Sequence, residues 1–221
     1  MSYKAAIFDL DGTLLDTLDD LYNAVNVTME HFDLPKRTRT EVRSFVGNGV
    51  ERLIELSVPQ GRENASFAEA VTFYRAYYAE HSERQTAPYD GVVELIDELI
   101  ADGIAVAVVS NKPHGSTVSL CARYFPRLTV VCGEREAEGV RRKPYPDTVY
   151  KAVEALGLSV GECVYIGDSE VDIRTAENAG MDVISVLWGF RDEELLVREG
   201  GTVFVRTARE LYDAIVGTER H

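Results

Sequence analysis

The sequence predicts an α/β fold, with a parallel sheet as its core and an all-helical segment inserted after the first strand. From about residue 90 to the end, short β-branched runs alternate with segments of helical periodicity, which is typical of a parallel sheet covered by helices. The apolar runs are continuous rather than alternating, as in strands that are buried on both faces. Residues 16–85 contain no comparable run and therefore predict helices alone.

Each expected element of the core follows from one apolar run or one periodic segment. The first strand is the run at residues 5–8, and the chain reaches it almost at once. Later strands are expected at residues 104–109, 128–131, 163–166, 183–186 and 202–205. The intervening helices are expected at residues 91–102, 114–124, 146–157, 170–179 and 207–216.

The helical segment, residues 16–85, is expected to form a cap domain, while residues 1–15 and 86–221 form the core domain. Its first helix is indicated by an apolar stripe at Leu18, Leu21, Val25, Met29 and Phe32. Further helices are expected near residues 40–46, 49–57 and 66–83, the last beginning with a capping box of Ser66 and Glu69. Inserted at the carboxyl edge of a strand, this domain could act as a lid that excludes water. The alternative is a set of extra helices packed on the sheet.

Composition argues against several classes of function. The 221 residues include 37 acidic and 23 basic side chains, and a net charge of −14 disfavours binding to nucleic acid or to an anionic membrane. No apolar stretch has the length of a membrane span, and the early first strand leaves no room for a signal peptide. The three cysteines lack the spacing of a metal site or a disulfide framework, so we expect reduced thiols in a cytoplasmic protein.

The strongest candidate site begins where the first strand ends, at Phe8-Asp9-Leu10-Asp11-Gly12-Thr13. Asp11-Gly12 is a turn signal, so Asp9 is expected at the carboxyl edge of the sheet, where open α/β sheets bind ligands. Carboxylates crowded at such an edge suit a hard cation such as Mg²⁺. An aspartate can also attack phosphorus and form an aspartyl phosphate. The alternative is a solvated acidic turn.

Two further strand ends carry groups that suit a phosphate. Ser110 and Asn111 follow the strand at 104–109, where a hydroxyl and backbone amides can bind phosphate oxygens, or can simply cap the next helix. Lys143 lies in a basic cluster just before Pro144. An ammonium there could hold the nucleophile and neutralise phosphoryl charge. Arg142 is the rival for this role, and a solvated basic loop is the alternative for the whole cluster.

A second pair of carboxylates follows the strand at 163–166, where Gly167 permits a tight bend. Asp168 is expected at the strand edge, and Asp172 lies one helical turn later on the same side. Such a pair suits one metal ligand and one residue that orients it, or else ordinary N-capping and stabilisation of the helix dipole. Together, the four strand ends offer a nucleophile, a phosphate cradle, a cation and a metal site, which are the parts that phosphoryl transfer requires.

The order of these motifs resembles that of the haloacid dehalogenase-like phosphohydrolases. The matching motifs are Asp9-Leu10-Asp11-Gly12-Thr13, Ser110-Asn111, Lys143-Pro144, and Gly167-Asp168-Ser169 with Asp172. The resemblance spans nearly the whole chain and implies a Rossmann-like core with a helical cap after strand one. Within the family, the phosphoglycolate phosphatases are most similar, through local matches that include Val46-Gly47-Asn48-Gly49 and Ser110-Asn111-Lys112-Pro113. Related pyrophosphatases share much of this pattern.

The resemblance implies a Mg²⁺-dependent phosphomonoesterase that acts on a small phosphorylated metabolite. Asp9 would attack phosphorus, and Asp11 would protonate the leaving oxygen and then activate water. Ser110 and Lys143 would hold the phosphoryl oxygens. The substrate would also meet Thr13, Asn111, Gly47 and Asn48, the last two as a specificity loop of the cap or else as a plain turn. The implied Mg²⁺ ligands are Asp9, Asp168 and the backbone carbonyl of Asp11, with Asp172 supporting either the metal or Lys143.

Other functions stay open on the same sequence. An inorganic pyrophosphatase or a sugar phosphomutase could share this scaffold. A phospho-accepting signalling domain also uses aspartate, Mg²⁺, a hydroxyl and a lysine, but the paired acids of strand one and the inserted lid argue against it. The expected partner is a small phosphorylated metabolite, without nucleic acid or membrane, and the expected state is a monomer or a weak homodimer.

Overall fold

The computed structural model describes residues 3–217 and divides into two compact units. One unit is the chain up to Leu15 together with the chain from Pro88 onward, and the other is Asp16–Ala87. The first division coincides with the expected one between residues 15 and 16. The second lies at Ala87 and Pro88 rather than between residues 85 and 86.

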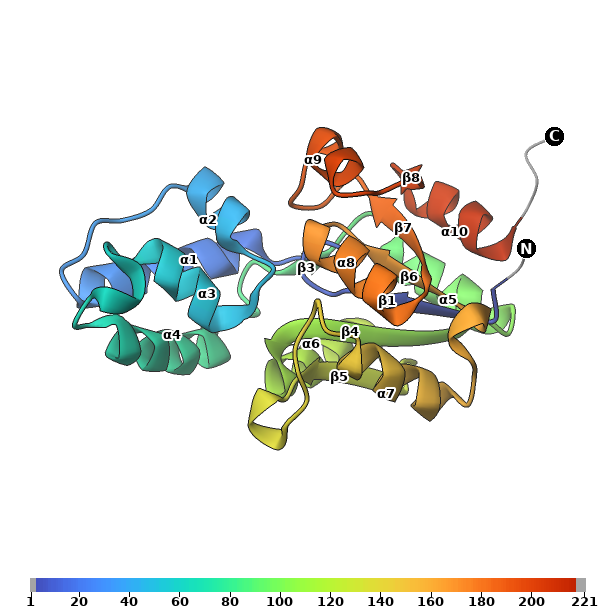
Figure 1. Ribbon diagram of the computed structural model, residues 1–221, viewed down its shortest axis with the longest axis horizontal. Helices are drawn as coiled ribbons and strands as arrows, with labels where there is room; N and C mark the ends of the chain where they lie inside the picture. Colours follow the sequence, from blue (N-terminus) through green and yellow to red (C-terminus); the bar gives the residue numbers. More distant parts are fainter. Residues whose placement is uncertain (1–2, 218–221) are drawn as a thin grey trace. The chain divides into compact units, whose positions relative to one another are not determined.

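The core unit is built on a six-stranded parallel sheet with the strand order β5-β4-β1-β6-β7-β8 (Figure 1). The strands are β1 (Ala5–Phe8), β4 (Ala105–Pro113), β5 (Val130–Glu134), β6 (Cys163–Gly167), β7 (Asp182–Val186) and β8 (Phe204–Val205). Because β1 lies between β4 and β6, the chain fills one side of the sheet first and then the other. The carboxyl ends of these three strands therefore meet at the topological switch point, where such sheets bind ligands.

Helices cover both faces of this sheet (Figure 1). They are α5 (Val92–Ala101), α6 (His114–Tyr124), α7 (Asp147–Leu156), α8 (Glu170–Ala179), α9 (Glu193–Arg198) and α10 (Ala208–Val216), with short 3₁₀ turns at Glu136–Glu138 and Val160–Glu162. In β1, Ala6 and Phe8 face the cluster formed with α5, α6 and α10, whereas Ala5 and Ile7 face the cluster formed with α7 and α8. This two-sided burial confirms the α/β fold with a parallel sheet, and it explains why the strand runs are continuously apolar.

Three core elements differ from the sequence-based expectation. β4 does not end at residue 109 but continues through Pro113, with a register shift against β5 between Val109 and Pro113. β5 begins at Val130 and ends at Glu134, later than the apolar run at 128–131 suggested. Helix α9 was not anticipated, because its six residues are too few to show a helical period.

The second unit is all-helical apart from a short strand at each junction with the core. Its helices are α1 (Leu18–His31), α2 (Arg39–Phe45), α3 (Gly49–Ser57) and α4 (Phe67–His81), with a 3₁₀ turn at Gly61–Glu63; β2 (Leu15–Asp16) pairs with β3 (Ala87–Pro88) where the chain leaves and re-enters the core. The predicted apolar stripe of α1 is buried at Leu18, Leu21, Val25 and Met29. The expected insertion of a helical segment after the first strand of the α/β fold is thereby confirmed.

The expected capping box at Ser66 is wrong. The Asn64 side chain accepts a hydrogen bond from the Ser66 amide over 2.9 Å, and Ser66 already has a helical backbone conformation. Its hydroxyl therefore makes no cap bond. A capping box occurs instead at Thr38 and Glu41, where Glu41 N donates to Thr38 Oγ1 over 3.2 Å and Thr38 N donates to Glu41 Oε2 over 2.7 Å.

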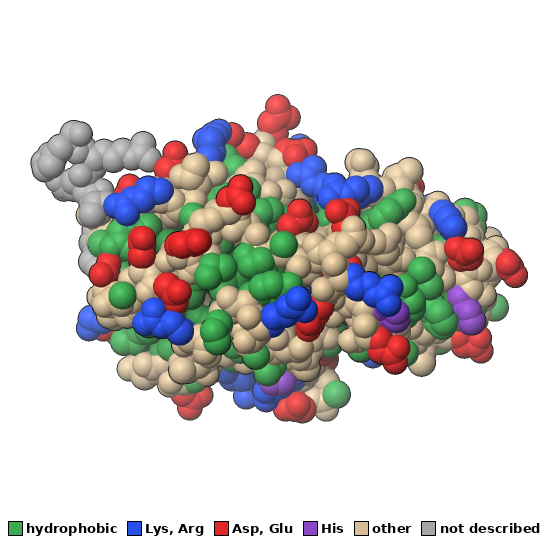
Figure 2. Space-filling model, turned by 180° about the vertical axis from the view of Figure 1, so that it is seen from behind, with side chains coloured by type: hydrophobic (Ala, Val, Ile, Leu, Met, Phe, Trp, Pro, Cys, Tyr) green, Lys and Arg blue, Asp and Glu red, His purple; other side chains and the backbone are tan. Residues whose placement is uncertain are grey.

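Charged side chains of both signs are interspersed over the face of the molecule drawn in Figure 2. Within the described part of the chain, several exposed charged side chains form ion pairs, such as Arg127 with Asp97, and such pairs contribute little to stability. Within residues 3–217, no helix combines the length and the apolar character that a membrane crossing requires.

Candidate active site

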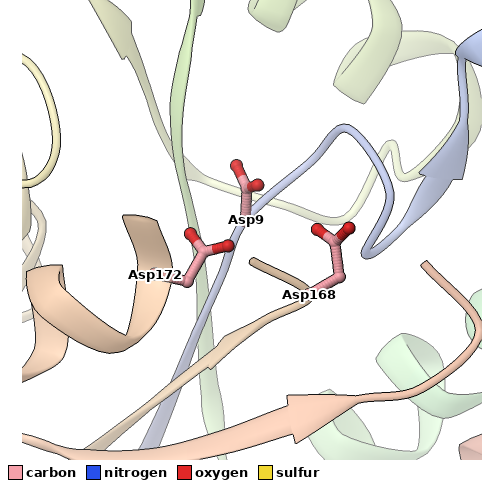
Figure 3. Close-up of side chains that lie close together, drawn as sticks. All are labelled: Asp9, Asp168 and Asp172. Carbon is pink, nitrogen blue, oxygen red and sulfur yellow. The ribbon is translucent and has the colours of Figure 1, made fainter. Parts of the chain in front are cut away.

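Three buried carboxylates meet at the carboxyl ends of β1 and β6. Asp9 follows β1, Asp168 follows β6, and Asp172 lies in the first turn of α8 (Figure 3). One oxygen from each lies within 4.8 Å of the others, and none of the three residues is more than 8% exposed. Asp9 is held at the switch point by its amide, which donates to Ile166 O over 2.8 Å.

The backbone around these carboxylates is packed so closely that several positions require glycine, among them Gly12 and Gly189. Gly12 has a φ of +87°, and a Cβ there would lie 2.4 Å from Asp168 Oδ2. A Cβ on Gly189 would lie 2.3 Å from Asp168 Cβ. The loop after β1 and the loop after β7 therefore both approach Asp168 at backbone distance.

Lys143 supplies the positive charge of this cluster. Its Nζ lies 2.8 Å from Asp9 Oδ1 and 2.7 Å from Asp172 Oδ1, and its side chain is 2% exposed. Burial disfavours the ammonium, but the Asp172 and Asp9 carboxylates outweigh it and raise the pKa of Lys143 well above its ordinary value. Lys143 is therefore a fixed cation at neutral pH.

Lys143, and not the alternative candidate Arg142, is the basic residue that lies against Asp9. Arg142 Nη1 lies 3.6 Å from Glu136 Oε2 in a partly exposed ion pair. The Lys143 backbone is instead held by Asn111: Lys143 N donates to Asn111 Oδ1 over 2.8 Å, and Asn111 Nδ2 donates to Lys143 O over 3.0 Å. The Asn111 side chain, expected among the substrate-binding groups, thus anchors the lysine in this structure.

Asp172 is already engaged through both carboxylate oxygens. Oδ1 accepts from Lys143, while Oδ2 accepts from Ser169 N over 3.1 Å and from Ser169 Oγ over 2.6 Å. Tyr165, buried in β6, completes the arrangement with its hydroxyl 3.1 Å from Lys143 Nζ. Through these contacts Asp172 holds the Lys143 ammonium in the orientation in which it also contacts Asp9.

Asp168 is held from two sides. Thr13 Oγ1 donates to Asp168 Oδ1 over 3.1 Å, and Phe190 N donates to Asp168 Oδ2 over 2.7 Å. The Thr13 hydroxyl, expected to bind substrate, is therefore bonded to a carboxylate of the acidic cluster. Both Asp168 oxygens retain lone pairs for a further ligand.

Burial raises the pKa of both Asp9 and Asp168. For Asp9 the pKa is raised well above the ordinary value, against the opposing effect of Lys143 and with a further rise from Asp172 and Asp168. For Asp168, burial and the neighbouring Asp172 carboxylate raise the pKa from 3.8 to about 7. The three carboxylates offer oxygen ligands and outnumber the single Lys143 charge, which suits a hard divalent cation, so this acidic cluster of Asp9, Asp168 and Asp172 could hold a metal.

Asp11 lies outside this acidic cluster and has a partner of its own. Lys112 Nζ donates to Asp11 Oδ1 over 2.8 Å and to Oδ2 over 3.1 Å. Ser110 precedes Lys112 by two residues in β4, and its Oγ accepts a hydrogen bond from Lys112 N over 3.2 Å. Gly47 and Asn48 belong to the helical unit, where they lie between α2 and α3, and their place in the site stays a prediction.

Sequence comparison with known proteins identifies the family to which this site belongs. The haloacid dehalogenase-like hydrolase family matches residues 6–186. The chain belongs to this hydrolase family. It is 34% identical over 197 residues to a phosphoglycolate phosphatase of Thiobacillus denitrificans, covering 85% of this chain and 84% of that one. It is also 32% identical over 226 residues to a phosphoglycolate phosphatase of Agrobacterium fabrum, covering 96% and 93%.

Structural comparison extends the likeness to 98% of the chain. A solved structure from Lactobacillus delbrueckii subsp. bulgaricus superposes with a TM-score of 0.93 at 38% identity, covering 98% of this chain and 100% of that one. The resemblance inferred from the four motifs is confirmed, and so is the enzyme class, a phosphoric monoester hydrolase.

Two residues of this hydrolase site were missed as site residues in the sequence. Lys112 was named only within the motif Ser110-Asn111-Lys112-Pro113. Lys112 follows Ser110 by two positions, however, so the two side chains lie on the same face of an extended strand. Tyr165 was hidden in an apolar run, yet a buried tyrosine needs a partner for its hydroxyl. The spacing of Lys112 and the burial of Tyr165 could be inferred from the sequence, but neither observation shows which residue the side chain contacts.

The metal-free hydrolase is expected to lose stability as pH rises, and Asp168→Asn should reduce that loss. The pKa of Asp168 is about 7 in the folded protein, against its ordinary value of 3.8, which applies to the unfolded chain. Between pH 3.8 and about 7 the folded protein therefore binds a proton more tightly than the unfolded chain. The free energy of unfolding therefore falls by on the order of 1 kcal/mol for each pH unit in this window. Urea unfolding of the wild type and of Asp168→Asn, in EDTA at about pH 5 and pH 8, measures this change in the free energy of unfolding. Equal pH dependence in the wild type and the variant would contradict the assignment.

Proposed function

We propose that this hydrolase is a Mg²⁺-dependent phosphomonoesterase that acts through an aspartyl phosphate on Asp9. The observation that carries the proposal is the buried ion pair of 2.8 Å between Lys143 Nζ and Asp9 Oδ1 at the switch point of the sheet. A nucleophilic carboxylate needs its charge balanced and its orientation held while an anionic phosphoryl group approaches. Lys143, itself held by Asp172, would do both, and Ser110 in β4 would bind a phosphoryl oxygen.

The first step forms a bond between an Asp9 carboxylate oxygen and phosphorus, and breaks the bond between phosphorus and the ester oxygen. Asp11, which must carry a proton at the start of this step, gives that proton to the leaving oxygen. In the second step Asp11 takes a proton from water, whose oxygen bonds to phosphorus as the bond to Asp9 breaks. Phosphate is released and both aspartates return to their starting states. Asp11 suits this work because it is 15% exposed at its side chain, outside the acidic cluster.

Mg²⁺ would be held by Asp9, Asp168 and the backbone carbonyl of Asp11. It would supply charge that stabilises the phosphoryl oxygens in the transition state. The contacts of Asp172 with Lys143 and Ser169 favour the orienting role for this residue over direct ligation. These ligands would all bind through oxygen, and most of them are carboxylates, which Mg²⁺ prefers.

The substrate class that we propose is a small phosphate monoester of the phosphoglycolate type. It is supported by relatives named phosphoglycolate phosphatase that are 34% and 32% identical to this chain over the aligned residues. The monomeric or weakly dimeric state, the lack of nucleic-acid and membrane partners and the cytoplasmic location stay predictions.

Phosphate release from a panel of small phosphoesters and pyrophosphate tests the proposal. With Mg²⁺ present we expect release from phosphoglycolate above the other esters, and in excess EDTA we expect no release, because unneutralised carboxylates repel the phosphate dianion. Asp9→Asn serves as the control for contaminating phosphatases.

Each outcome of this panel decides between the candidates. Preference for pyrophosphate would assign a pyrophosphatase, and sugar-phosphate isomerisation without phosphate release would assign a mutase. Full activity in EDTA would refute the metal role, whatever the preferred substrate.

A further inference from the structure

Each aspartate of Asp9-Leu10-Asp11 is paired with a lysine of its own. Lys143 lies against Asp9, and Lys112 Nζ donates to both carboxylate oxygens of Asp11, over 2.8 and 3.1 Å. The proposed function uses Lys143, Asp9 and Asp11 but assigns no part to Lys112. Its side chain is 2% exposed, and a lysine is almost never so buried unless it is paired.

The sheet brings Lys112 to Asp11. Strands β1 and β4 are neighbours, with Phe8 opposite Val108, and Asp11 and Lys112 follow these paired positions by three and four residues. The Lys112 backbone is then held at both ends: its amide donates to Ser110 Oγ over 3.2 Å, and its carbonyl accepts from Thr117 Oγ1 over 3.2 Å. Lys112 therefore approaches Asp11 from a fixed backbone.

The contact restricts the Asp11 carboxyl group. One ammonium that binds both oxygens opposes rotation of the carboxyl group about its bond to Cβ, a torsion that is otherwise broad. Burial of the Lys112 side chain strengthens this electrostatic contact relative to one in water. A proton donor is effective only when its oxygen lies within hydrogen-bond reach of the leaving oxygen, so its orientation affects the rate.

We propose that Lys112 is a positioning residue that sets the orientation of the Asp11 carboxyl group for proton transfer. The proposal rests on the proposed function, in which Asp11 is the general acid and base. Protonation matters most when the leaving group is a strongly basic alkoxide and least when it is a stable anion such as p-nitrophenolate. Loss of Lys112 should therefore slow the first step according to the basicity of the leaving group.

Lys112→Met, which keeps the length and removes the ammonium, tests this. The rate constant of the first turnover is measured by rapid quench in Mg²⁺, with phosphoglycolate as the alkyl ester and p-nitrophenyl phosphate as the aryl ester. We expect about 10²-fold slowing for the alkyl ester and about 3-fold or less for the aryl ester, since general acid catalysis contributes at least about 10²-fold. Lys112→Arg should recover part of the alkyl-ester rate.

Matched variants separate positioning from general damage. Lys4→Met removes a lysine from an ion pair with Glu162, of 2.6 Å, on the surface of the same unit, and should leave both rates unchanged. Asp11→Asn should show the same dependence on the leaving group, and Lys112→Met added to it should slow the enzyme little further. If Lys112→Met does not fold, Lys112→Gln is measured in the same way.

Equal slowing of both esters, or full additivity with Asp11→Asn, would overturn the positioning role. Failure of the proposed function gives a different result: the wild type would then release no product from either ester, or Asp9→Asn would retain turnover. The two failures are therefore distinguishable in the same set of measurements.

Discussion

Asp9→Asn is expected to lower phosphate release by about 10⁴-fold or more while the protein stays folded. An amide cannot attack phosphorus, so the aspartyl phosphate cannot form. The substitution conserves volume, and the Asn oxygen can still accept from Lys143, which lies 2.8 Å from Asp9 Oδ1. Burial raises the pKa of Asp9 well above its usual range, so loss of this carboxylate removes charge that burial disfavours. Steady-state phosphate release and thermal unfolding measure the two effects.

The control for Asp9→Asn is Asp97→Asn, the same substitution at an exposed ion pair with Arg127. It should keep full activity and nearly full stability. Undiminished phosphate release by Asp9→Asn would remove the nucleophile assignment, and with it the aspartyl-phosphate route. Loss of folding in Asp9→Asn would contradict the view that this carboxylate serves function at a cost in stability.

Lys143→Met is expected to reduce both activity and stability. Turnover should fall by about 10³-fold to 10⁵-fold, because a fixed cation on the transferred phosphoryl group has effects of this size in phosphoryl transfer. The free energy of unfolding should fall by about 3–5 kcal/mol, because Asp172 and Asp9 lose the partner of a buried ion pair. Phosphate release at a temperature below unfolding, together with urea unfolding, measures both.

Arg142→Met is the matched control, since Arg142 adjoins Lys143 in sequence but pairs with Glu136 near the surface. It should change stability by less than about 1 kcal/mol and leave activity intact. The double variant Lys143→Met with Asp172→Asn removes both buried charges, and should regain stability without regaining activity. Recovery of activity in the double variant, or loss of activity only in Arg142→Met, would contradict the role of Lys143.

Most of the fold could be predicted because its signals are local. Helices α6 and α8 lie at the expected residues, His114–Tyr124 and Glu170–Ala179, since apolar periodicity and turn residues mark both ends. The late end of β4 could not be predicted, because Ser110 to Pro113 has a polar and turn-like composition. Tertiary pairing with β5 extends the strand through residues whose own preference is for a turn.

The candidate site was predictable to the level of residue types at strand ends. Asp9 and Asp168 were expected at the carboxyl edge, and both lie there in one acidic cluster. The partners of Thr13 and Asn111 were not predictable, because each hydroxyl or amide could have met a ligand, a backbone group or another side chain. In the structure, Thr13 bonds Asp168 and Asn111 bonds the Lys143 backbone.

The sequence by itself determined the fold class, the insertion of a helical cap after strand one, and the four motifs that identify the hydrolase family. Each is written in a short stretch of chain, through periodicity, turn chemistry or residue spacing. Only the tertiary structure decided that Lys143 rather than Arg142 lies on Asp9, and that Lys112 lies on Asp11. These pairings join residues more than 100 positions apart, and they depend on strand order, register and the direction of side chains, which no local pattern specifies.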